Sequence, residues 1–389
     1  MKSNYEPLGK HIRLVDYRNS EEVTSTVLGI SIDKEFMPSV ANVIGTDLSR
    51  YKLISKGLFA CNPMHVGRDE RLPIALYEKD NAAIVSPAYF MFEIIDRDVL
   101  NEEYLMMWFR RPEFDRECWF MTDGSVRGGI TWDDLCRIKL PVPSYARQCE
   151  IVESYRAITD RIALKRAEND NLEATAQAVF QEQFASFYGA DELPDGYRII
   201  NLDNLCTVKG GKRLPADCKL LDTPTDHPYI RVRDVGSNRY VCLTNQFQYI
   251  DEETYSAISR YIVNTGDIVI SIVGTIGLLG KIHSSLDKAN LTENCVKLAN
   301  IHTVTSDYLY YTLCYKKQIK EIDLLTVGAV QAKLPMYNIQ SMKILVPPTK
   351  AIEAFQRKMN VLNEQIEANT VEIQKLYELE EVLLAKLSD

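Results

Sequence analysis

The sequence predicts an α+β protein in which two mixed α/β domains are joined by two long antiparallel coiled-coil helices and related by an internal pseudo-two-fold repeat. Three observations lead to this prediction. The second half of the chain repeats the pattern of the first, each copy ends in a long segment without Gly or Pro, and the remaining segments alternate short apolar runs with turns. A chain of 389 residues is long enough for two to three domains.

The repeat has a constant offset over its best-matched part. Residues 123–144 (DGSVRGGITWDDLCRIKLPVPS) align without gaps with residues 327–348 (VGAVQAKLPMYNIQSMKILVPP), and residues 102–109 align with 306–313 at the same offset. Gly124 thereby meets Gly328, and Pro143 meets Pro347. The repeat predicts four parts: a first domain at 1–146, a helix at 147–188, a second domain at 189–349 and a second helix at 350–389.

Each copy is predicted to end in a coiled-coil helix. Ala, Glu, Gln, Leu and Lys dominate residues 147–187 and 350–389, and such residues favour helix. Apolar residues recur at alternating steps of four and three, which is the pattern of a coiled-coil seam. Polar residues, among them Lys165 and Glu380, interrupt the two seams. A long helix with an apolar stripe must pack against another helix. The two alternatives are the helix of the other copy in the same chain and a helix of a second molecule. The predicted seam residues are Ile151, Tyr155, Ile158, Ile162, Asn169 and Leu172 in the first helix, and Phe355, Met359, Leu362, Ile366, Asn369, Ile373 and Leu376 in the second.

The globular parts are predicted to consist of short strands. Tyr229 to Val235 (YIRVRDV) alternates apolar and charged residues, as a strand with one solvated face does. Asp267 to Gly274 (DIVISIVG) is apolar enough for a buried strand, and Gly57 to Ala60 and Tyr89 to Ile95 are its counterparts in the first copy. Strands separated by loops and short helices favour an α+β arrangement over a doubly wound sheet.

The chain offers no recognisable catalytic, metal or nucleotide site. The nine cysteines contain no CxxC pair, and the five histidines show no metal-ligand spacing, which argues against zinc and for a reducing, cytoplasmic environment. Gly274 to Lys281 (GTIGLLGK) departs from the phosphate-loop spacing and is better explained as strand, turn and strand. Asn62-Pro63-Met64 lacks the second proline and the aromatic residue of an amino-methyltransferase motif.

Basic residues near glycines are the candidate binding groups. The net charge of −9 disfavours nucleic acid, but residues 191–349 carry 17 Lys and Arg against 17 Asp and Glu and are neutral. Lys and Arg beside glycine can approach phosphates closely. A charged cluster is otherwise a solvated face, and for Lys316–Lys320 the two interpretations are equally balanced. The candidates for DNA contact are Lys209, Lys212, Arg213, Arg231, Arg233 and Arg239 in the second copy, and Arg68 and Arg71 in the first.

Taken together, these features resemble the specificity (S) subunit of type I restriction–modification systems over essentially the whole chain. The resemblance rests on the repeat, on YIRVRDV, on Gly266 to Gly277 (GDIVISIVGTIG), and on a signature before each helix. That signature is Gly124…Arg127…Leu140-Pro141-Val142-Pro143 in the first copy and Gly328…Gln331…Leu345-Val346-Pro347-Pro348 in the second. The Glu-Gln pair that often opens the family's helices is replaced by Arg147-Gln148 and by Ala351-Ile352-Glu353.

The resemblance implies a DNA-reading subunit without catalytic residues of its own. Each domain would read one half of a bipartite double-stranded DNA target, and the helices would set the spacing between the halves. Two DNA methyltransferase subunits, which bind S-adenosylmethionine, and restriction or translocase subunits, which hydrolyse ATP, would be the protein partners. The signature adds Arg127, Gln331 and Lys333 to the DNA candidates. The alternatives are a coiled-coil scaffold with two protein-binding heads and no DNA role, and a self-contained methyltransferase, which would need a cofactor loop that the sequence does not show.

Overall fold

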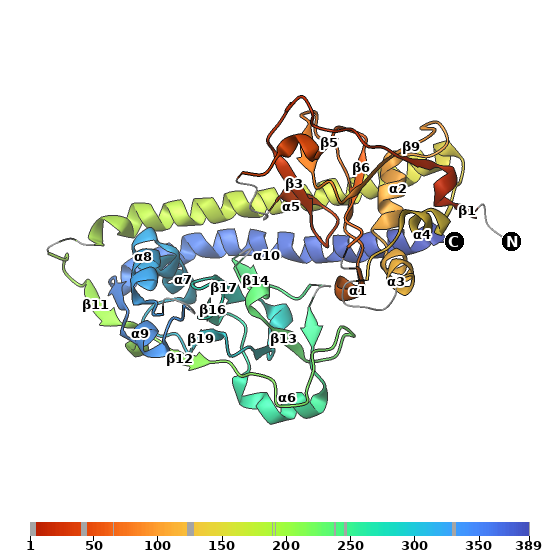
Figure 1. Cartoon of the computed structure of the whole chain (residues 1–389). Helices are drawn as coiled ribbons and strands as arrows, with labels where there is room; N and C mark the ends of the chain where they lie inside the picture. The colour runs from red at the N-terminus through yellow and green to blue at the C-terminus, as the bar shows by residue number, and fades with distance from the viewer. Residues whose placement is uncertain are drawn as a thin grey trace. The chain divides into compact units, whose positions relative to one another are not determined.

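The computed structural model of the chain describes residues 5–39, 45–64, 66–122, 128–188, 190, 192–236, 239–244, 247–328 and 332–388. The chain divides into two compact units, unit 1 (Met1–Leu164 and Lys375–Asp389) and unit 2 (Lys165–Gln374). Both contain sheets and short helices, and two long helices pass through them, so the predicted α+β class is confirmed (Figure 1). No helix in these described ranges is long and apolar enough to cross a membrane.

Unit 1 is built around a four-stranded antiparallel sheet of order β2-β9-β6-β7. A second sheet has the order β4-β3-β8-β5, and β1 pairs with β10 in a two-stranded ribbon. The strands are β1 (Tyr5–Pro7), β2 (Ile12–Leu14), β3 (Val27–Ile30), β4 (Phe36–Pro38), β5 (Lys52–Ile54), β6 (Phe59–Cys61), β7 (Ile74–Leu76), β8 (Ala83–Val85), β9 (Phe90–Ile94) and β10 (Lys139–Pro141). The helices are α1 (Val66–Asp69), α2 (Glu102–Phe109), α3 (Pro112–Phe120), α4 (Trp132–Arg137) and the first part of α5 (Tyr145–Phe184).

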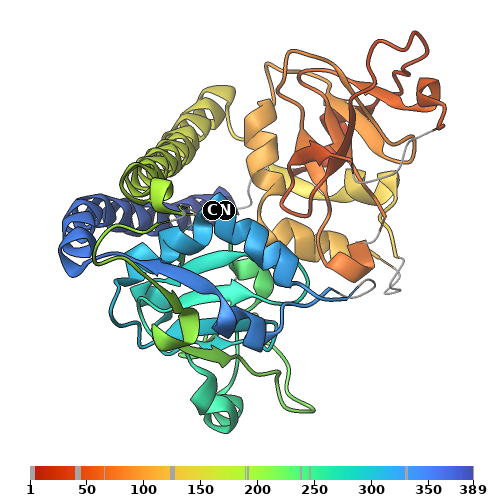
Figure 2. The ribbon, with the colours of Figure 1, turned by 90° about the vertical axis from the view of Figure 1, so that its left-hand side faces the viewer.

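Unit 2 is built in the same way around a five-stranded sheet of order β12-β19-β16-β17-β14, with helices α7 and α8 against it (Figure 2). A small sheet has the order β15-β13-β18, and β11 pairs with β20 in a ribbon. The strands are β11 (Arg198–Asn201), β12 (Thr207–Gly210), β13 (Pro228–Ile230), β14 (Tyr240–Val241), β15 (Gln248–Tyr249), β16 (Ile268–Ser271), β17 (Leu279–Ile282), β18 (Asn290–Leu291), β19 (Cys295–Ala299) and β20 (Lys343–Val346). The helices are α6 (Glu252–Ile258), α7 (Ser306–Cys314), α8 (Lys316–Leu325), α9 (Met336–Ser341) and α10 (Thr349–Ala385).

Strands β16 and β6, which lie inside the two main sheets, are largely apolar because both of their faces are covered. In β16, Ile268 and Ile270 belong to the core cluster that includes α7, while Val269, which points the other way, belongs to a second cluster behind the sheet. In β6, Phe59 and Ala60 divide in the same manner. Continuous apolar runs in the sequence therefore mark strands that lie between two cores.

The repeat predicted from the sequence is present in four strands of the main sheets and in every helix and strand from α2 to α5. Strands β2-β9-β6-β7 of unit 1 have the same order and antiparallel pairing as β12-β19-β16-β17 of unit 2. From α2 onward the offset is constant: α2, α3, α4, β10 and α5 begin at residues 102, 112, 132, 139 and 145, and α7, α8, α9, β20 and α10 begin at 306, 316, 336, 343 and 349.

A tyrosine hydrogen bond is also repeated. The hydroxyl of Tyr104 donates to the carbonyl of Pro141 at 3.1 Å, and the hydroxyl of Tyr308 donates to the carbonyl of Leu345 at 2.7 Å. Both tyrosines are buried, and both bonds tie the first helix after the sheet to the strand that leads into a long helix. A buried hydroxyl needs a hydrogen-bond partner. The tyrosine that the two copies share at positions 104 and 308 therefore makes the same hydrogen bond in each copy.

The two long helices pair with each other in antiparallel fashion. In unit 2, Lys165 contacts Asn369, whereas Phe180, further along α5, packs beside Phe355, which precedes Asn369 in α10. Of the predicted seam residues, Tyr155, Ile162, Phe355, Met359, Ile366 and Asn369 are buried, and Ile151, Ile158, Asn169, Leu172, Leu362, Ile373 and Leu376 are half-buried. Apolar seam positions therefore meet within the chain, as the intramolecular alternative expects.

The polar seam residues contact one another. Lys165 Nζ lies 3.1 Å from Asn369 Oδ1, and Asn369 Nδ2 donates to Asn169 Oδ1 at 2.9 Å. In unit 1, the hydroxyl of Tyr155 donates to Glu380 at 2.6 Å. Lys165 and Asn369 are 204 residues apart and therefore occupy equivalent positions of the two copies. If the two copies had identical sequences, a contact between equivalent positions would join two identical residues. In this chain it joins the lysine Lys165 to the asparagine Asn369.

Replacing Asn369 by lysine is expected to lower the free energy of unfolding by about 1–3 kcal/mol, because it places two ammonium groups in one buried contact. Combining it with Lys165→Asn restores one lysine and one asparagine and should recover part of that loss. Urea denaturation of the wild type, the two single variants and the double variant measures the coupling. Equal stability of N369K and the double variant would contradict the direct contact.

One strand prediction is wrong over most of its length. Tyr229–Val235 was expected to form a single strand, but β13 ends at Ile230 and residues Val232–Asp234 form a short 3-10 helix. The cause is Asp234, whose carboxylate accepts hydrogen bonds from the backbone N–H and the side chain of Arg231. Such a local bond offers the backbone an alternative to strand pairing.

Candidate nucleic-acid interface

The basic loop after β12 is held by its glycine. The backbone N–H of Gly211 donates to Cys295 at 3.0 Å, and that of Lys212 donates to Leu291 at 2.8 Å. A Cβ on Gly211 would lie 2.1 Å from the carbonyl oxygen of Thr292, so no larger residue fits here. The loop backbone is thus fixed against β18 and β19 while the side chains of Lys209, Lys212 and Arg213 are exposed.

Arg213 and Lys212 each contact a neighbouring side chain at the surface. Arg213 Nε donates to Glu293 Oε1 at 2.7 Å, and its side chain remains 81% exposed. Lys212 Nζ lies 5.7 Å from the ring centre of Tyr261. These contacts orient the two cations without burying them, which leaves both charges available to an anionic ligand.

Helix α9, which begins three residues after Lys333, starts beside this loop, because a Cβ on Gly210 would lie 3.4 Å from the side chain of Met336. Lys333 itself pairs with Val273, and the N–H of Leu334 donates to the carbonyl of Ile272 at 3.0 Å. Val273 of GDIVISIVGTIG and the segment Lys333–Leu334 therefore meet in unit 2, and the helix that follows this segment begins beside the basic loop.

Unit 1 has the corresponding junction. The N–H of Ile130 donates to the carbonyl of Pro63 at 3.1 Å, as Leu334 does to Ile272 in unit 2. A Cβ on Gly129 would lie 2.8 Å from the same Pro63 oxygen. Asn62-Pro63-Met64 is accordingly a turn after β6, in which Asn62 Oδ1 accepts from the N–H of Met64 at 3.2 Å.

The remaining DNA candidates are distributed unevenly. Arg71 is exposed and lies 3.3 Å from Asp33, and Arg233 is exposed beside Asp234. Arg231 is largely buried and bonds to Asp234 and to Gln248. Arg127, Gln331 and the side chain of Arg68 lie outside the described part of the chain, as do Gly124 and Val330 of the repeat.

Arg239 does not lie on the surface. Its side chain is 2% exposed and forms an ion pair with Asp307 inside unit 2, between the sheet and the long helices. Three tyrosine rings, those of Tyr240, Tyr310 and Tyr311, surround its guanidinium. We therefore replace the prediction of DNA contact for Arg239 by a structural role. The local sequence around Arg239 does not indicate this role, because the partner carboxylate is 68 residues away.

Sequence reasoning missed two exposed apolar residues. Phe120 at the end of α3 is 86% exposed, and Leu324 near the end of α8 is 85% exposed. They occupy equivalent positions of the repeat, each just before the loop that carries the signature. Tyr337 on α9 is also exposed. The repeat alignment was the one signal that could have identified the first two.

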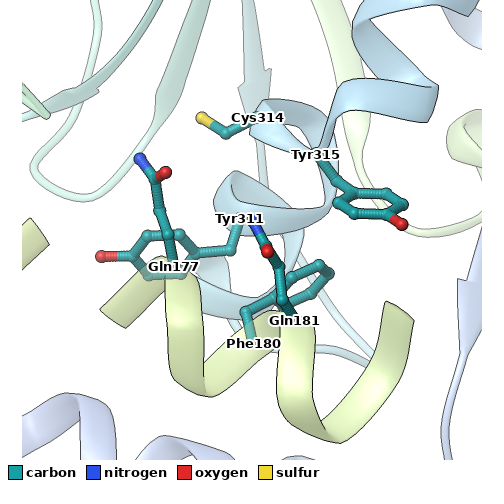
Figure 3. A pocket seen from close by; sticks show the side chains of 6 residues that line it. All are labelled: Gln177, Phe180, Gln181, Tyr311, Cys314 and Tyr315. Carbon is teal, nitrogen blue, oxygen red and sulfur yellow. The ribbon is translucent and has the colours of Figure 1, made fainter. Parts of the chain in front are cut away.

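The described residues offer little to a metal or a small cofactor. No group of three or more His, Cys, Asp or Glu within them is placed to hold a metal ion. A small hollow between α5 and α7 is lined by Gln177, Phe180, Gln181, Tyr311, Cys314 and Tyr315 and has room for about one water molecule (Figure 3). Burial raises the pKa of the Cys314 thiol to about 12, so this sulfur is not a reactive thiolate.

Comparison with known proteins supports the predicted resemblance. The family described as "Type I restriction modification DNA specificity domain" matches residues 194–382. A type I restriction enzyme MjaIX specificity subunit of Methanocaldococcus jannaschii is 22% identical over 314 residues, which cover 76% of this chain and 70% of that protein. The HindI specificity subunit of Haemophilus influenzae is 21% identical over 66% of this chain and 70% of its own length.

A solved structure shows the same fold. The crystal structure of a type I restriction–modification system S subunit from M. genitalium has a TM-score of 0.50 and 14% sequence identity, and the alignment covers all of this chain and 96% of that one. The sequence matches and the shared fold together confirm the resemblance predicted from the repeat and its motifs.

Proposed function

We propose that this chain reads a bipartite DNA target and directs modification and restriction subunits to it. The proposal starts from its resemblance to type I restriction–modification specificity subunits and from the match of residues 194–382 to the specificity domain. Each domain of the repeat reads one half of the target. The paired helices α5 and α10 set the distance between the halves. Methylation and cleavage take place on partner subunits, and this chain supplies no catalytic residue.

The repeat is the observation that carries the proposal. The two main sheets share their strand order, and five consecutive elements keep one offset, while the segments between β2 and β9 and between β12 and β19 differ in length and in their helices and strands. A shared framework with different loops is what two half-sites of different sequence require, since the framework positions the domain and the loops contact base edges.

The internal repeat also suggests how many methyltransferase subunits this chain binds. Two equivalent halves offer two equivalent binding places, which supports two methyltransferase subunits for each copy of this chain. Those subunits would bind S-adenosylmethionine, and the restriction or translocase subunits would bind ATP. Positive surface supplied by these partners would offset the net charge of −9 that this chain carries alone.

We expect the exposed loop after β12 to contact phosphate. Replacing Lys212 and Arg213 by alanine in the complex with the methyltransferase subunits should weaken DNA binding by about tenfold or more and reduce the slope of log affinity against log salt by about 2. Fluorescence anisotropy with a duplex taken from the host methylome, at several salt concentrations, measures both effects.

Arg357→Ala with Lys358→Ala, an adjacent exposed pair on α10, is the matched control and should leave the salt slope unchanged. Unchanged affinity and slope in the Lys212 and Arg213 variant would reject the loop as a contact. Failure of the assembled wild-type complex to retain any duplex would reject DNA reading itself and favour the coiled-coil scaffold with two protein-binding heads.

A further inference from the structure

Helix α10 carries a polar stripe in addition to its seam. The stripe consists of Gln356, Asn363, Glu367 and Gln374, and all four side chains contact the globular part of unit 2. Their spacing of seven, four and seven residues places them on one side of the helix, turned by about 100° from the apolar seam. The helix therefore binds α5 with one face and the domain with another.

One end of the stripe holds a buried carboxylate. Gln356 Nε2 and Asn363 Nδ2 both donate to Asp307 Oδ2, at 2.6 and 2.8 Å. The other oxygen, Oδ1, accepts from Lys281 Nζ at 2.6 Å and from Arg239. Asp307 is the second residue of α7 and its side chain is 3% exposed, so this carboxylate links the sheet, α7 and α10.

The charges in this cluster hold one another in place. Burial alone would raise the pKa of Asp307, but Lys281 and Arg239 lower it to about 2, so the carboxylate stays ionised. Arg239 Nη1 also donates to Asn363 Oδ1 at 2.6 Å and lies 4.0 Å from Glu173 of α5. Hydrogen bonds between ionised groups are directional and tolerate little displacement. Both long helices are thereby fixed against the domain at a defined height and rotation.

The other end of the stripe meets the edge of the sheet. His283 Nε2, just after β17, lies 2.8 Å from Glu367 Oε1, and Gln374 Nε2 donates to the carbonyl of Leu243 at 3.1 Å. Apolar contacts are less directional than hydrogen bonds, so they fix the height and rotation of a helix less sharply than these polar contacts do. A shift of α10 by one residue moves each stripe position by about 1.5 Å along the axis and about 100° around it, which breaks all of these contacts together.

The stripe belongs to the second copy and not to the shared framework. The equivalent positions in α5 are Val152, Thr159, Ala163 and Asp170, of which only Thr159 and Asp170 are polar. In unit 1, the residue equivalent to Asp307 is Glu103, and it pairs with Arg156 of α5. The first copy thus joins its domain to its helix with a different and more exposed set of polar contacts.

We propose that the polar stripe of α10, together with Asp307, sets the position of the second domain along and around its helix and thereby the half-site spacing that the protein accepts. These are positioning residues that touch no DNA. The inference rests on the proposed function, because it assigns to named residues the geometry on which a spacing rule depends.

The test uses the complex with methyltransferase subunits and duplexes that carry both half-sites with spacers varied in single base-pair steps. For Asn363→Ala with Gln374→Ala, the preference for the native spacer over its neighbours should fall by about tenfold, the effect of losing one or two hydrogen bonds. Affinity for a duplex with the second half-site alone should stay within about twofold. Glu364→Ala with Val371→Ala, on the exposed side of α10, is the control and should change neither value.

A second variant, Glu367→Ala with Gln374→Ala, leaves the contacts of Asp307 intact. If the first variant does not fold, the spacer preference of this second variant tests the inference. Unchanged spacer preference in the folded variants would overturn the inference, and so would an equal loss of affinity for the single half-site, which indicates general destabilisation. A wild-type complex that binds its half-sites with no spacer preference would instead contradict the proposed function.

Discussion

Replacement of Phe355 by alanine is expected to lower the free energy of unfolding of unit 2 by about 3–5 kcal/mol, the range for removing a buried phenylalanine. Phe355 is fully buried, and its ring centre lies 5.5 Å from that of Phe184 and 6.0 Å from that of Phe180. Tyr308 and Tyr311 complete the cluster, which joins α5, α7 and α10. The change therefore leaves a cavity where three helices meet.

The aromatic residues allow the two units to be followed separately. All three tryptophans, Trp108, Trp119 and Trp132, belong to unit 1, so tryptophan fluorescence reports on that unit, whereas 12 of the 21 tyrosines lie in unit 2 and contribute the larger share of the tyrosine signal. Urea unfolding of Phe355→Ala should shift the tyrosine transition more than the tryptophan transition. The matched control is Ile151→Ala at the equivalent, half-buried position of α5, with a smaller expected loss. A loss below about 1 kcal/mol in Phe355→Ala would show that the cluster does not stabilise unit 2.

Lengthening both long helices by one heptad is expected to lengthen the recognised spacer by about three base pairs. One heptad adds about 10 Å of helix, and each base pair adds about 3.4 Å of duplex. The insertions belong between Leu164 and Lys165 and between Gln374 and Lys375, where the chain passes from one compact unit to the other. Each unit then keeps its own contacts, and seven residues preserve the heptad phase of the seam.

Long-read sequencing of the host methylome measures the outcome directly, because modified sites report both half-sites and the spacer. A heptad inserted into α5 alone is the control and should impair folding, since its seam then falls out of register with α10. Unchanged spacer length in the doubly extended protein would reject the idea that the helices act as a ruler.

The parts of the fold that follow from local sequence were predictable. The helices α5 and α10 were expected from composition and heptad spacing, and the constant offset from α2 to α5 was visible as paired residues such as Tyr104 and Tyr308. A turn such as that at Gly266, whose φ is +84°, also follows from the residue itself. These features depend on neighbours in the chain, which a sequence displays.

The parts that depend on distant partners were not predictable. The strand expected at Tyr229–Val235 ends early because Asp234 captures the backbone of Arg231. Arg239 resembles any surface arginine in sequence, and only its folded position beside Asp307 shows that it is buried. The polar stripe on α10 has the composition of a solvated helix face. Of the DNA candidates, Lys212, Arg213 and Lys333 are exposed on unit 2, and their contact with DNA stays a prediction.

In each domain the first strand pairs with the last strand, and this arrangement affects how a domain could be exchanged during evolution. In unit 1, β1 pairs with β10 and the N–H of Leu8 donates to Ile138, and in unit 2, β11 pairs with β20 and the N–H of Leu202 donates to Met342. The entry and exit of each domain therefore lie side by side on neighbouring strands. A genetic exchange of the sequence between these two strands would replace a whole domain, and both of its ends would join the rest of the chain next to each other. On the proposed function, such an exchange would change the recognised half-site in a single event and would leave the helices, and the spacing proposed for them, unchanged.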